Sequence, residues 1–570
     1  MNVTSYPKTE SWENSSTDCC NWDGVTCDTE SGKVIGLDLS CSCLHGQLEP
    51  NSSLFSLKHL TSLNLAYTNF TLSPIPDKFN NLMLLETLNL SVSSLKGLPR
   101  EILQLTNLVS LDLSSHYSPD TSFLLSIENP PLFLRLLAQN LRNLRALDMS
   151  YVNISSEILH EFSYMPSLRT LHLASCYLVG EFPSSVFMIP NLQSIILDYN
   201  PDLRGNLPVF RRNNSMQVLS LWETSFSGII PDSIGNLKHL ASLKLAISIF
   251  SGRIPFSLGE LSNLSRLSLS SNYFTGEVPS SFGNLKQLIR FSVGGNQLTG
   301  NFPSALLNLT KLRIINLISN QFTGAVPSSL LQISSLTRLS LDDYQLSDLI
   351  GFENVSVLSN LQDLYFKSNN FRVSSPVDLN VFSSFKELVH LDLSGIPLST
   401  ANITSDSVFS SNFEDLYFPG CNITEFPEFL RDQRNLKYLY LSNNNIKGQL
   451  PDWLWRLQEL QDLDLSHNSL SGFDGSLKAV PGSQISIFDL SSNAFQGRIF
   501  IPYTSINYMF ASSNNFTGEI PRSLCGGKSS PAIIDLSKNN FHGSIPQCLG
   551  TNMSSLTDLN LHNNSLRKSS

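Results

Sequence analysis

One pattern of leucines recurs along almost the whole chain and decides what the chain can fold into. The pattern reads L-x-x-L-x-L-x-x-N-x-L/F-x-G-x-x-P and is followed by x-x-L-x-x-L. From Ser42 to Asn564 there are about 22 such units, most of them 23 to 25 residues long. A unit this short cannot bury its own leucines, so neighbouring units have to stack, and the core grows in one dimension. The 570 residues therefore predict one elongated array.

Each position of the unit has a physical role. In L-x-L the leucines alternate as in a short strand, so they face the core while the residue between them faces outward. The asparagine closes each turn by bonding neighbouring backbone groups with its amide, and Gly and Pro shape the return path. We expect an α/β repeat solenoid: a right-handed superhelix with a parallel sheet on its concave side and irregular or 3-10 structure on its convex side.

The asparagine position, here called the ladder position, tolerates other residues. Cys176 and Cys421 occupy it in two units, and we expect these buried cysteines to be inert thiols. Asn153 is also assigned to the ladder, so we expect its sequon to be poorly glycosylated. The other ladder residues include Asn272, Asn296, Asn320, Asn369, Asn444, Asn468, Asn493, Asn514, Asn539, Thr224 and Ser248.

The spacing of the units divides the chain into a cap and an array. Residues 1–33 are expected to form an incomplete cysteine cap, which covers the open end of the first repeat, and residues 34–570 form the repeats. We expect an insertion near residues 118–139 and irregular repeats near residues 346–412. Such extra residues are expected to leave the stack as surface loops, which often carry binding.

The chain has nine cysteines, an odd number for a secreted protein. Cys20 and Cys27 are the preferred pair in the cap, which leaves Cys19 to a partner further upstream. Cys41 and Cys43 flank the first ladder position and stay unassigned.

Two further cysteines, Cys525 and Cys548, occupy similar convex positions one unit apart. Adjacent units stack at about the strand separation of 4.8 Å. A disulfide spans a Cα separation of about 4.4 to 6.8 Å, so we predict a bridge between these two cysteines.

Composition argues against several classes of function. The formal net charge is −10, and no basic run could follow a phosphate backbone, so binding to nucleic acid or anionic lipid is not expected. No run of about 18 uncharged apolar residues, the length that spans a bilayer, occurs. No signal peptide is recognisable, yet about fifteen sequons favour a secreted chain, which we interpret as a fragment. The glycosylation candidates are Asn14, Asn51, Asn89, Asn263, Asn308, Asn354, Asn402 and Asn515.

Motifs for catalysis or metal binding do not occur in the sequence. It contains no nucleophile elbow, Walker loop, kinase glycine loop or H-E-x-x-H helix, and its ten histidines form no cluster with zinc spacing. Asp112, Asp392 and Asp464 recur in Leu-Asp-Leu-Ser, and we interpret them as solvated strand residues, because an open sheet does not supply the burial that neutral paired acids need. We expect no enzyme activity, no cofactor and no metal.

Ligand binding is better supported, by the outward strand positions. Most of these positions hold Asp, Ser or Asn, so any other residue there is informative. Aromatic and charged residues on a rigid exposed sheet are typical of interface hot spots. Two groups of departures are candidates for ligand binding: the first comprises His172, Ile196, Asp198, Tyr199, Trp222, Glu223 and Lys244, and the second comprises Asp342, Asp343, Tyr365, Lys367, Tyr417, Tyr438 and Tyr440.

Several stretches of the sequence resemble a known family. The L-x-G-x-I-P tail, seen as FTGEVP at residues 274–279 and FHGSIP at residues 541–546, is that of the plant-type leucine-rich repeat. CCNWDGVTC at residues 19–27 and GLDLSC at residues 36–41 resemble the cap of plant leucine-rich-repeat receptor-like proteins, the type that includes the leaf-mould-resistance receptors. The resemblance covers essentially the whole chain.

The resemblance implies the ectodomain of a single-pass plasma-membrane receptor that lacks a kinase domain. Such a receptor binds a microbial or endogenous protein or peptide and acts with co-receptor or adaptor receptor kinases in defence signalling. The sequence departs from the family at both ends, so membrane attachment would come only through segments missing from this chain. The alternatives are a receptor-kinase ectodomain in development or immunity, a secreted inhibitor of microbial wall-degrading enzymes, and a truncated product without a signalling role.

Overall fold

Two compact units make up the chain in the computed structural model, residues 1–297 and 298–570. Both units are built from the predicted repeat. The residues that the structure describes are 6–12, 18–115, 125–342, 345–350, 360–367, 376–403, 409, 413–474, 484–501, 506–525, 531–551 and 555–567.

The first unit contains a parallel sheet to which each repeat contributes one short strand. Identical positions of successive repeats face each other, so Leu243 pairs with Leu219 on one side and Leu267 on the other. An additional strand of the cap, β1 (Val25–Cys27), pairs antiparallel with β2. The parallel strands are β2 (Val34–Asp38), β3 (Ser62–Asn64), β4 (Thr87–Asn89), β5 (Ser110–Asp112), β6 (Ala146–Asp148), β7 (Thr170–His172), β9 (Ser194–Ile196), β11 (Val218–Ser220), β13 (Ser242–Lys244), β15 (Arg266–Ser268) and β17 (Arg290–Ser292).

The second unit has the same construction. Leu439 pairs with Leu416 on one side and Leu463 on the other, again at identical positions of the repeat. Its strands are β19 (Ile314–Asn316), β21 (Arg338–Ser340), β23 (Asp363–Tyr365), β25 (His390–Asp392), β27 (Asp415–Tyr417), β28 (Tyr438–Tyr440), β30 (Asp462–Asp464), β32 (Ile487–Asp489), β34 (Tyr508–Phe510), β36 (Ile533–Asp535) and β38 (Asp558–Asn560).

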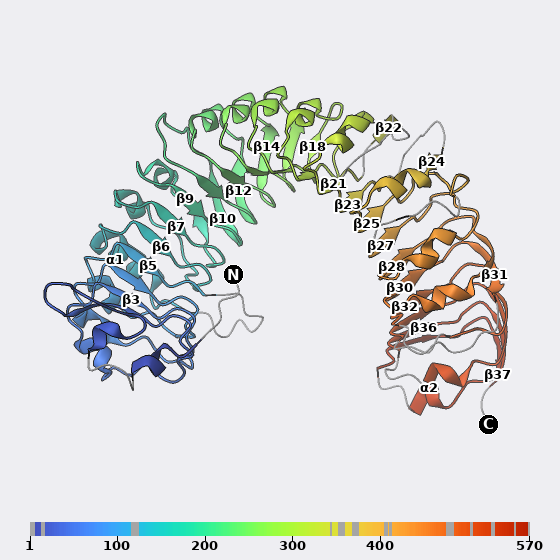
Figure 1. Cartoon of the computed structure of the whole chain (residues 1–570), viewed down its shortest axis with the longest axis horizontal. Coiled ribbons are helices and arrows are strands. Elements are labelled where there is room, and N and C mark those ends of the chain that lie inside the picture. The colour runs from blue at the N-terminus through green and yellow to red at the C-terminus, as the bar shows by residue number, and fades with distance from the viewer. Residues whose placement is uncertain are drawn as a thin grey trace. The chain divides into compact units, whose positions relative to one another are not determined.

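Short 3-10 helices lie on the face of each unit opposite the sheet (Figure 1). Most follow the proline of the repeat, which fixes φ just before the helix begins, as Pro255 does with φ −70°. They are η1 (Lys8–Trp12), η2 (Cys19–Asn21), η3 (Ser53–Ser56), η4 (Asp77–Asn81), η5 (Arg100–Gln104), η7 (His160–Tyr164), η8 (Ser184–Met188), η9 (Asp232–Asn236), η10 (Phe256–Glu260), η11 (Ser280–Asn284), η12 (Ser304–Asn308), η13 (Ser328–Gln332), η15 (Leu379–Ser384), η16 (Glu428–Asp432), η17 (Asp452–Arg456) and η18 (Arg522–Cys525).

Additional short strands, formed around the Gly-x-x-Pro tails, lie beside the main sheets. In the first unit they pair in parallel from β8 to β16. They are β8 (Gly180–Glu181), β10 (Asn200–Asn206), β12 (Thr224–Gly228), β14 (Ile249–Arg253), β16 (Tyr273–Gly276), β18 (Gln297–Leu298), β20 (Thr323–Pro327), β22 (Gln345–Ile350), β24 (Val377–Asp378), β26 (Leu398–Ser399), β29 (Lys447–Leu450), β31 (Ser469–Phe473), β33 (Gln496–Gly497), β35 (Asn515–Gly518), β37 (Asn540–Ser544) and β39 (Ser565–Arg567).

Leucine and phenylalanine side chains form a continuous core inside each unit. The residue two places after the ladder position is often phenylalanine, and these rings stack from one repeat to the next. Phe250 and Phe274 lie 6.4 Å apart between ring centroids, and Phe495 and Phe516 lie 5.4 Å apart. Each fully buried large apolar side chain contributes about 1.5–3 kcal/mol, so contact with the neighbouring repeats supplies most of the stability of each unit.

The ladder asparagines tie each repeat to the one before it. The Asn272 side-chain amide donates hydrogen bonds to the carbonyl oxygens of Leu245 (2.7 Å), Leu269 (3.1 Å) and Ser270 (3.1 Å). Its oxygen accepts the backbone N–H of Phe250 at 2.9 Å. One buried side chain therefore satisfies backbone groups that the tight turn would otherwise leave without partners.

The two ladder cysteines behave as the sequence predicts. Cys176 is fully buried, and burial raises the pKa of its thiol far above the usual range. Burial also raises the pKa of Cys421 to about 12. Since the thiolate is the reactive form of cysteine, neither side chain is set up for nucleophilic or metal chemistry.

The assignment of Asn153 to the ladder is wrong. Val152 occupies the ladder position and is fully buried. It lies three residues after Met149, which stands where most repeats have the second leucine of L-x-L. Asn153 is only half-buried, so the argument against glycosylation at its sequon no longer holds. Conversely, Asn200 is a fully buried ladder residue that the sequence analysis missed.

The insertion expected near residues 118–139 does not lie wholly outside the stacked repeats. Residues 116–124 lie outside the described residues. Residues 130–140 form an α-helix, α1 (Pro130–Asn140), which packs against η5 and η7. Its buried residues Phe133, Leu134 and Leu137 lie at helical spacing, so this part of the insertion belongs to the core, and the expectation of a surface loop is wrong for it.

The irregular region expected near residues 346–412 keeps one core strand per repeat, in β23 and β25. Its segments 351–359, 368–375, 404–408 and 410–412 lie outside the described residues, and with them the expectation of binding loops there.

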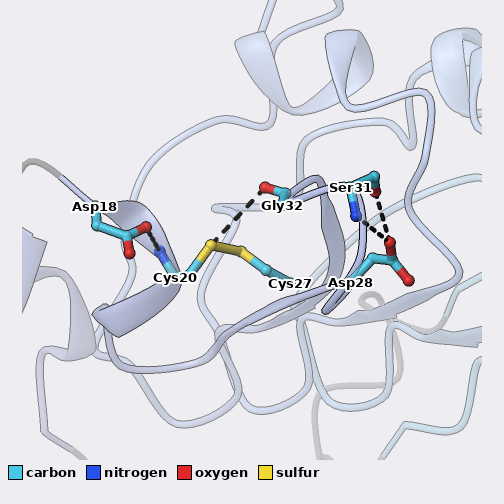
Figure 2. The surroundings of a disulfide bond; sticks show 6 residues. All are labelled: Asp18, Cys20, Cys27, Asp28, Ser31 and Gly32. Carbon is cyan, nitrogen blue, oxygen red and sulfur yellow. Dashed lines mark hydrogen bonds between the residues drawn. A yellow bond between two sulfur atoms is a disulfide. The ribbon is translucent and has the colours of Figure 1, made fainter.

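A disulfide joins Cys20 to Cys27 in the cap, in agreement with the preferred pairing (Figure 2). Asp18 accepts the backbone N–H of Cys20 at 3.0 Å, and Asp28 accepts both the N–H and the hydroxyl of Ser31. These bonds fix the short loops on either side of the disulfide.

The remaining cysteines divide into free and paired ones. Cys19, Cys41 and Cys43 are free thiols. Cys548 at the start of α2 (Cys548–Thr551) is disulfide-bonded, and α2 packs against η18, where Cys525 lies. The side chain of Cys525 lies outside the described residues, so its bridge to Cys548 stays a prediction.

The corrected assignment of the ladder residues can be tested with a matched control. Asn200 donates three hydrogen bonds and accepts two from buried backbone N–H groups. Asn200→Ala should cost about 3 kcal/mol or more, since each orphaned buried group costs about 1–3 kcal/mol, measured by urea unfolding. Asn153→Ala should change the free energy of unfolding by less than about 0.5 kcal/mol. Equal losses in the two variants would contradict the reassignment.

Candidate recognition surface

The residues on either side of the central leucine of each strand form the open face of the sheet. In β7, Leu171 is buried while Thr170 and His172 are half-buried and point away from the core. Because identical positions pair in register, these outward residues form two rows. The leading row holds the residue before the central leucine, and the trailing row holds the residue after it.

The margin of the face is set by a turn with unusual backbone geometry. The residue four places after the central leucine has a positive φ in many repeats, for example 59° at Tyr199, 56° at Glu223 and 54° at Ile247. For L-residues this conformation costs about 1–2 kcal/mol. Backbone hydrogen bonds between repeats hold it, as from the N–H of Tyr199 to the carbonyl of Trp222 at 2.8 Å.

An aromatic pair anchors the first candidate group. The rings of Tyr199 and Trp222 lie 4.9 Å apart between centroids, and Tyr199 is 39% exposed. Asp198 lies beneath them and accepts the backbone N–H of Trp222 at 3.0 Å. Asp198 is buried, contrary to its expected outward position, and burial raises the pKa of its carboxyl. It supports the aromatic pair rather than presenting a charge to solvent.

The trailing row continues the first group across neighbouring strands. His172 lies between the Asp148 carboxylate (3.2 Å) and the Ser194 hydroxyl (2.9 Å). Ile196 and Lys244 follow in the same row on β9 and β13, and both are half-buried. Six of the seven predicted residues, Asp198 excepted, therefore reach the face or its margin within β7 to β13.

Tyrosines in the trailing row form the centre of the second candidate group. Tyr417 and Tyr440, on adjacent strands, stack with ring centroids 4.8 Å apart and an angle of 18° between the ring planes. The Tyr440 hydroxyl donates to the Asp462 carboxylate at 3.3 Å. Burial, followed by the neighbouring carboxylates, raises the pKa of Tyr417 to about 12. Tyr365 lies in the same row, separated from Tyr417 by Asp392.

A chain of charges runs along the leading row of the same strands. Arg338 bonds Asp363 at 2.7 Å, and His390 lies 3.6 Å from Asp363 and 2.5 Å from Asp415. Tyr438 comes next in this row, on β28. Basic and acidic side chains therefore alternate along this row, and the aromatic Tyr438 follows them.

The remaining predicted residues of the second group lie at its edges. Asp342 accepts the backbone N–H of Lys367 at 2.8 Å, as Asp198 does for Trp222 in the first unit. Lys367 is exposed. Asp343 lies outside the described residues.

The sequence analysis missed the partners that hold these groups. The sequence analysis did not single out Asp148, Arg338, Asp363, His390 or Asp415. A usable signal was present, because each of them shares its repeat position with a charged or polar residue of the next unit, and such residues must lie side by side.

The carboxylates of the open face are more buried than expected. Burial raises the pKa of Asp112, Asp392 and Asp489 above the usual range, although hydrogen bonds from the following serines oppose the shift. Asp392, for instance, accepts the backbone N–H of Ser394 at 2.9 Å. The Leu-Asp-Leu-Ser acids were interpreted as solvated strand residues, whereas Asp112 and Asp392 are half-buried.

Most of the predicted glycosylation sites lie where a glycan can attach. Asn51, Asn263, Asn308, Asn402 and Asn515 are exposed. Their use stays a prediction, and Asn14 and Asn354 lie outside the described residues.

Asn89 differs from the other sequons because it lies on the face itself. It is half-buried in the trailing row of β4 and lines a hollow of the face together with Tyr67 and Asp112. A glycan there would cover this part of the sheet.

Groups that could hold a metal are scarce among the described residues. Only Cys19, Cys20 and Cys27 bring three ligand atoms together, and two of these sulfurs are joined in the disulfide. In the same described part of the chain, none of the helices combines the length and apolarity that membrane crossing requires.

Family models match three parts of the chain. Residues 2–28 match a leucine-rich-repeat N-terminal domain, residues 212–429 a leucine-rich repeat region, and residues 424–470 a leucine-rich repeat. With the parallel sheet and the ladder, these matches define a leucine-rich-repeat solenoid.

Curated relatives narrow this class. Receptor-like protein 6 of Arabidopsis thaliana is 63% identical over 593 residues, which cover 99% of this chain and 59% of the relative. Receptor-like protein 7 of the same plant is 59% identical, covering 93% of this chain and 56% of the relative. Receptor-like protein Cf-9 of Solanum pimpinellifolium is 39% identical over 43% of this chain and 27% of the relative. Plant leucine-rich-repeat receptor-like proteins are thus close homologues of this chain, which spans somewhat more than half the length of the first two relatives.

Solved structures share the architecture. A complex of PEPR1 with AtPEP1 has a TM-score of 0.66 and 27% identity, covering 99% of this chain and 77% of that chain. The Arabidopsis receptor kinase HAESA, in complex with an IDA peptide hormone, has a TM-score of 0.68 and 23% identity, covering 99% and 95%. The second likeness concerns the fold alone.

The burial of Asp392 predicts a pH-dependent stability. Its pKa is raised in the folded chain, so its contribution to stability is complete below the unfolded pKa of about 3.9 and is lost as the pH rises through the folded value. Asp392→Asn keeps an acceptor for Ser394 and removes the charge. This variant should have a higher urea midpoint than the parent chain at pH 7, and the difference should vanish below about pH 4. A lower midpoint at pH 7 would contradict this account.

Proposed function

We propose that this chain is the extracellular recognition module of a plant cell-surface receptor-like protein, which binds a microbial or endogenous protein or peptide and acts with a co-receptor kinase in defence signalling. The observation that carries the proposal is the open sheet face, where aromatic and charged side chains are held in place by neighbouring repeats. Trp222 is fixed by Asp198, and Tyr440 by Tyr417 and Asp462. Side chains fixed before binding lose less entropy when a ligand arrives.

The relatives support this proposal. Those named above are receptor-like proteins, and the PEPR1 complex with AtPEP1 is formed by a protein of the same architecture. The sequons support passage through the secretory pathway. In this proposal, a co-receptor kinase takes part in signalling.

The composition of the two candidate groups supports a location for the ligand. Both combine tyrosine or tryptophan with charged residues on a rigid sheet, which is the usual composition of interface hot spots. We infer that the ligand contacts at least one of the two groups.

Alanine substitutions in the two groups test the proposal. The secreted chain is immobilised and exposed to fractionated microbial culture proteins and plant extracellular fluid, and each retained peptide is then synthesised and titrated. Trp222→Ala or Tyr440→Ala should weaken saturable binding at least about tenfold, since truncated hot-spot residues cost about 2 kcal/mol or more. Tyr273→Ala is the control, because Tyr273 is 54% exposed but lies on β16, outside both groups.

Two results would count against the proposal. Unchanged affinity in both variants would remove the candidate groups from the binding surface. The absence of any saturable protein or peptide ligand in these fractions would contradict the recognition function itself.

A further inference from the structure

We propose that the second group recognises a positively charged side chain: the stacked Tyr417–Tyr440 pair and the carboxylates of Asp462, Asp464 and Asp489 bind an arginine of a peptide ligand. This inference rests on the proposed function, since it names the chemistry of the ligand that the recognition module takes. It is drawn from the arrangement of β27, β28, β30 and β32 in the second unit.

The tyrosine pair offers a half-buried aromatic platform. Because the rings of Tyr417 and Tyr440 stack face to face with centroids 4.8 Å apart, each ring keeps only its outer face, and that of Tyr440 lies on the side of β30. Tyr438 borders it in the leading row of β28. A guanidinium group stacks on such a ring and is attracted to its negative face when it lies within about 6 Å of the centroid.

Carboxylates follow directly after the tyrosines on the next two strands. Asp464 pairs in register with Tyr440 on one side and with Asp489 on the other. Asp462 lies in the leading row of β30 and accepts the Tyr440 hydroxyl at 3.3 Å. Asp462 and Asp464 therefore adjoin Tyr440, and Asp489 extends the acidic row by one more strand.

In the described part of the chain, Asp462, Asp464 and Asp489 have only neutral hydrogen-bond donors and form no ion pair. Two acids at or beside the preceding strands are paired with cations: Asp363 with Arg338 at 2.7 Å, and Glu414 with Lys437 at 2.6 Å. Asp392, on the other side of the tyrosine pair, also accepts only from a neutral donor, Ser394. Asp392 is flanked by tyrosines in its row, whereas Asp464 and Asp489 lie next to each other on two successive strands.

The acids accept neutral donors instead. Asp464 accepts the backbone N–H of Ser466 at 3.0 Å, and Asp489 that of Ser491 at 2.8 Å. His467, at the margin of the face, lowers the pKa of Asp489 only slightly against the effects of burial and of Asp464, which raise it.

Two acids placed directly opposite each other on neighbouring strands repel each other. Asp464 and Asp489 are in this position and are both half-buried. A cation bound between them would relieve the repulsion and replace water at carboxylates that already lie partly out of solvent. An arginine fits best, because its planar fork can pair with a carboxylate through two N–H groups while its plane rests on a tyrosine ring.

The test uses the whole secreted chain and two matched probes, N-acetyl hexa-arginine amide and the isosteric, uncharged hexa-citrulline amide. By isothermal titration at about 0.15 M salt, where charges are screened beyond about 8 Å, hexa-arginine should bind at least tenfold more tightly than hexa-citrulline. Asp464→Asn combined with Asp489→Asn should reduce hexa-arginine affinity at least tenfold. Tyr440→Ala should reduce it similarly, and Tyr440→Phe, which keeps the ring, by less than threefold.

The control removes the same two charges elsewhere. Asp112→Asn combined with Asp535→Asn alters two trailing-row acids that also accept the N–H of the following serine, but neither adjoins the tyrosine pair. This double variant should bind hexa-arginine like the parent chain. An equal loss in the control would overturn the inference, since it would reduce binding to attraction by an acidic protein. Equal affinity of the unmodified chain for the two peptides would also overturn the inference. This outcome does not depend on whether the variants fold.

The outcome can be separated from that of the proposed function. A chain without preference for arginine can still bind its ligand through the first group, so the recognition function would stand. A chain that prefers arginine but retains no protein or peptide from the tested fractions would keep this site and lose the proposed function.

Discussion

Hydrogen bonds of buried ladder side chains, present in most repeats but not at Val152, hold the open face of the sheet in register. Asn272 connects its own turn to the backbone of the preceding repeat on both the donor and the acceptor side. Because every strand then begins at the same point of its repeat, equivalent residues come to lie beside each other at strand spacing. The stacking of Tyr417 on Tyr440 and the pairing of His172 with Asp148 both follow from this register.

The two candidate groups show how one scaffold produces surfaces of different character. In the first unit, an aromatic pair stands over a buried carboxylate, and Lys244 and His172 provide positive or titratable groups nearby. In the second, tyrosines separate a balanced chain of charges from a set of acids. The backbone is the same in both, so the difference lies entirely in the side chains placed in two rows.

Much of this arrangement follows from the sequence, because position in the repeat determines position on the face. In this way the sequence predicted the strand of every repeat and the neighbourhood of Tyr417 and Tyr440. It also predicted the Cys20–Cys27 pair in the cap. The errors arose where the repeat is interrupted. The insertion before Val152 shifted the ladder assignment by one residue, and the burial of Asp198, which accepts the backbone N–H of Trp222, is not conveyed by any spacing rule.

The positive φ at the margin of the face has a consequence for how such a surface diversifies. Tyr199, Glu223 and Ile247 share this conformation although none of them favours it. The bonds between repeats impose it, so the cost is similar whichever side chain stands there, and exchanging one residue for another leaves the main chain in place. New specificities can therefore accumulate by single replacements along this edge without passing through misfolded intermediates.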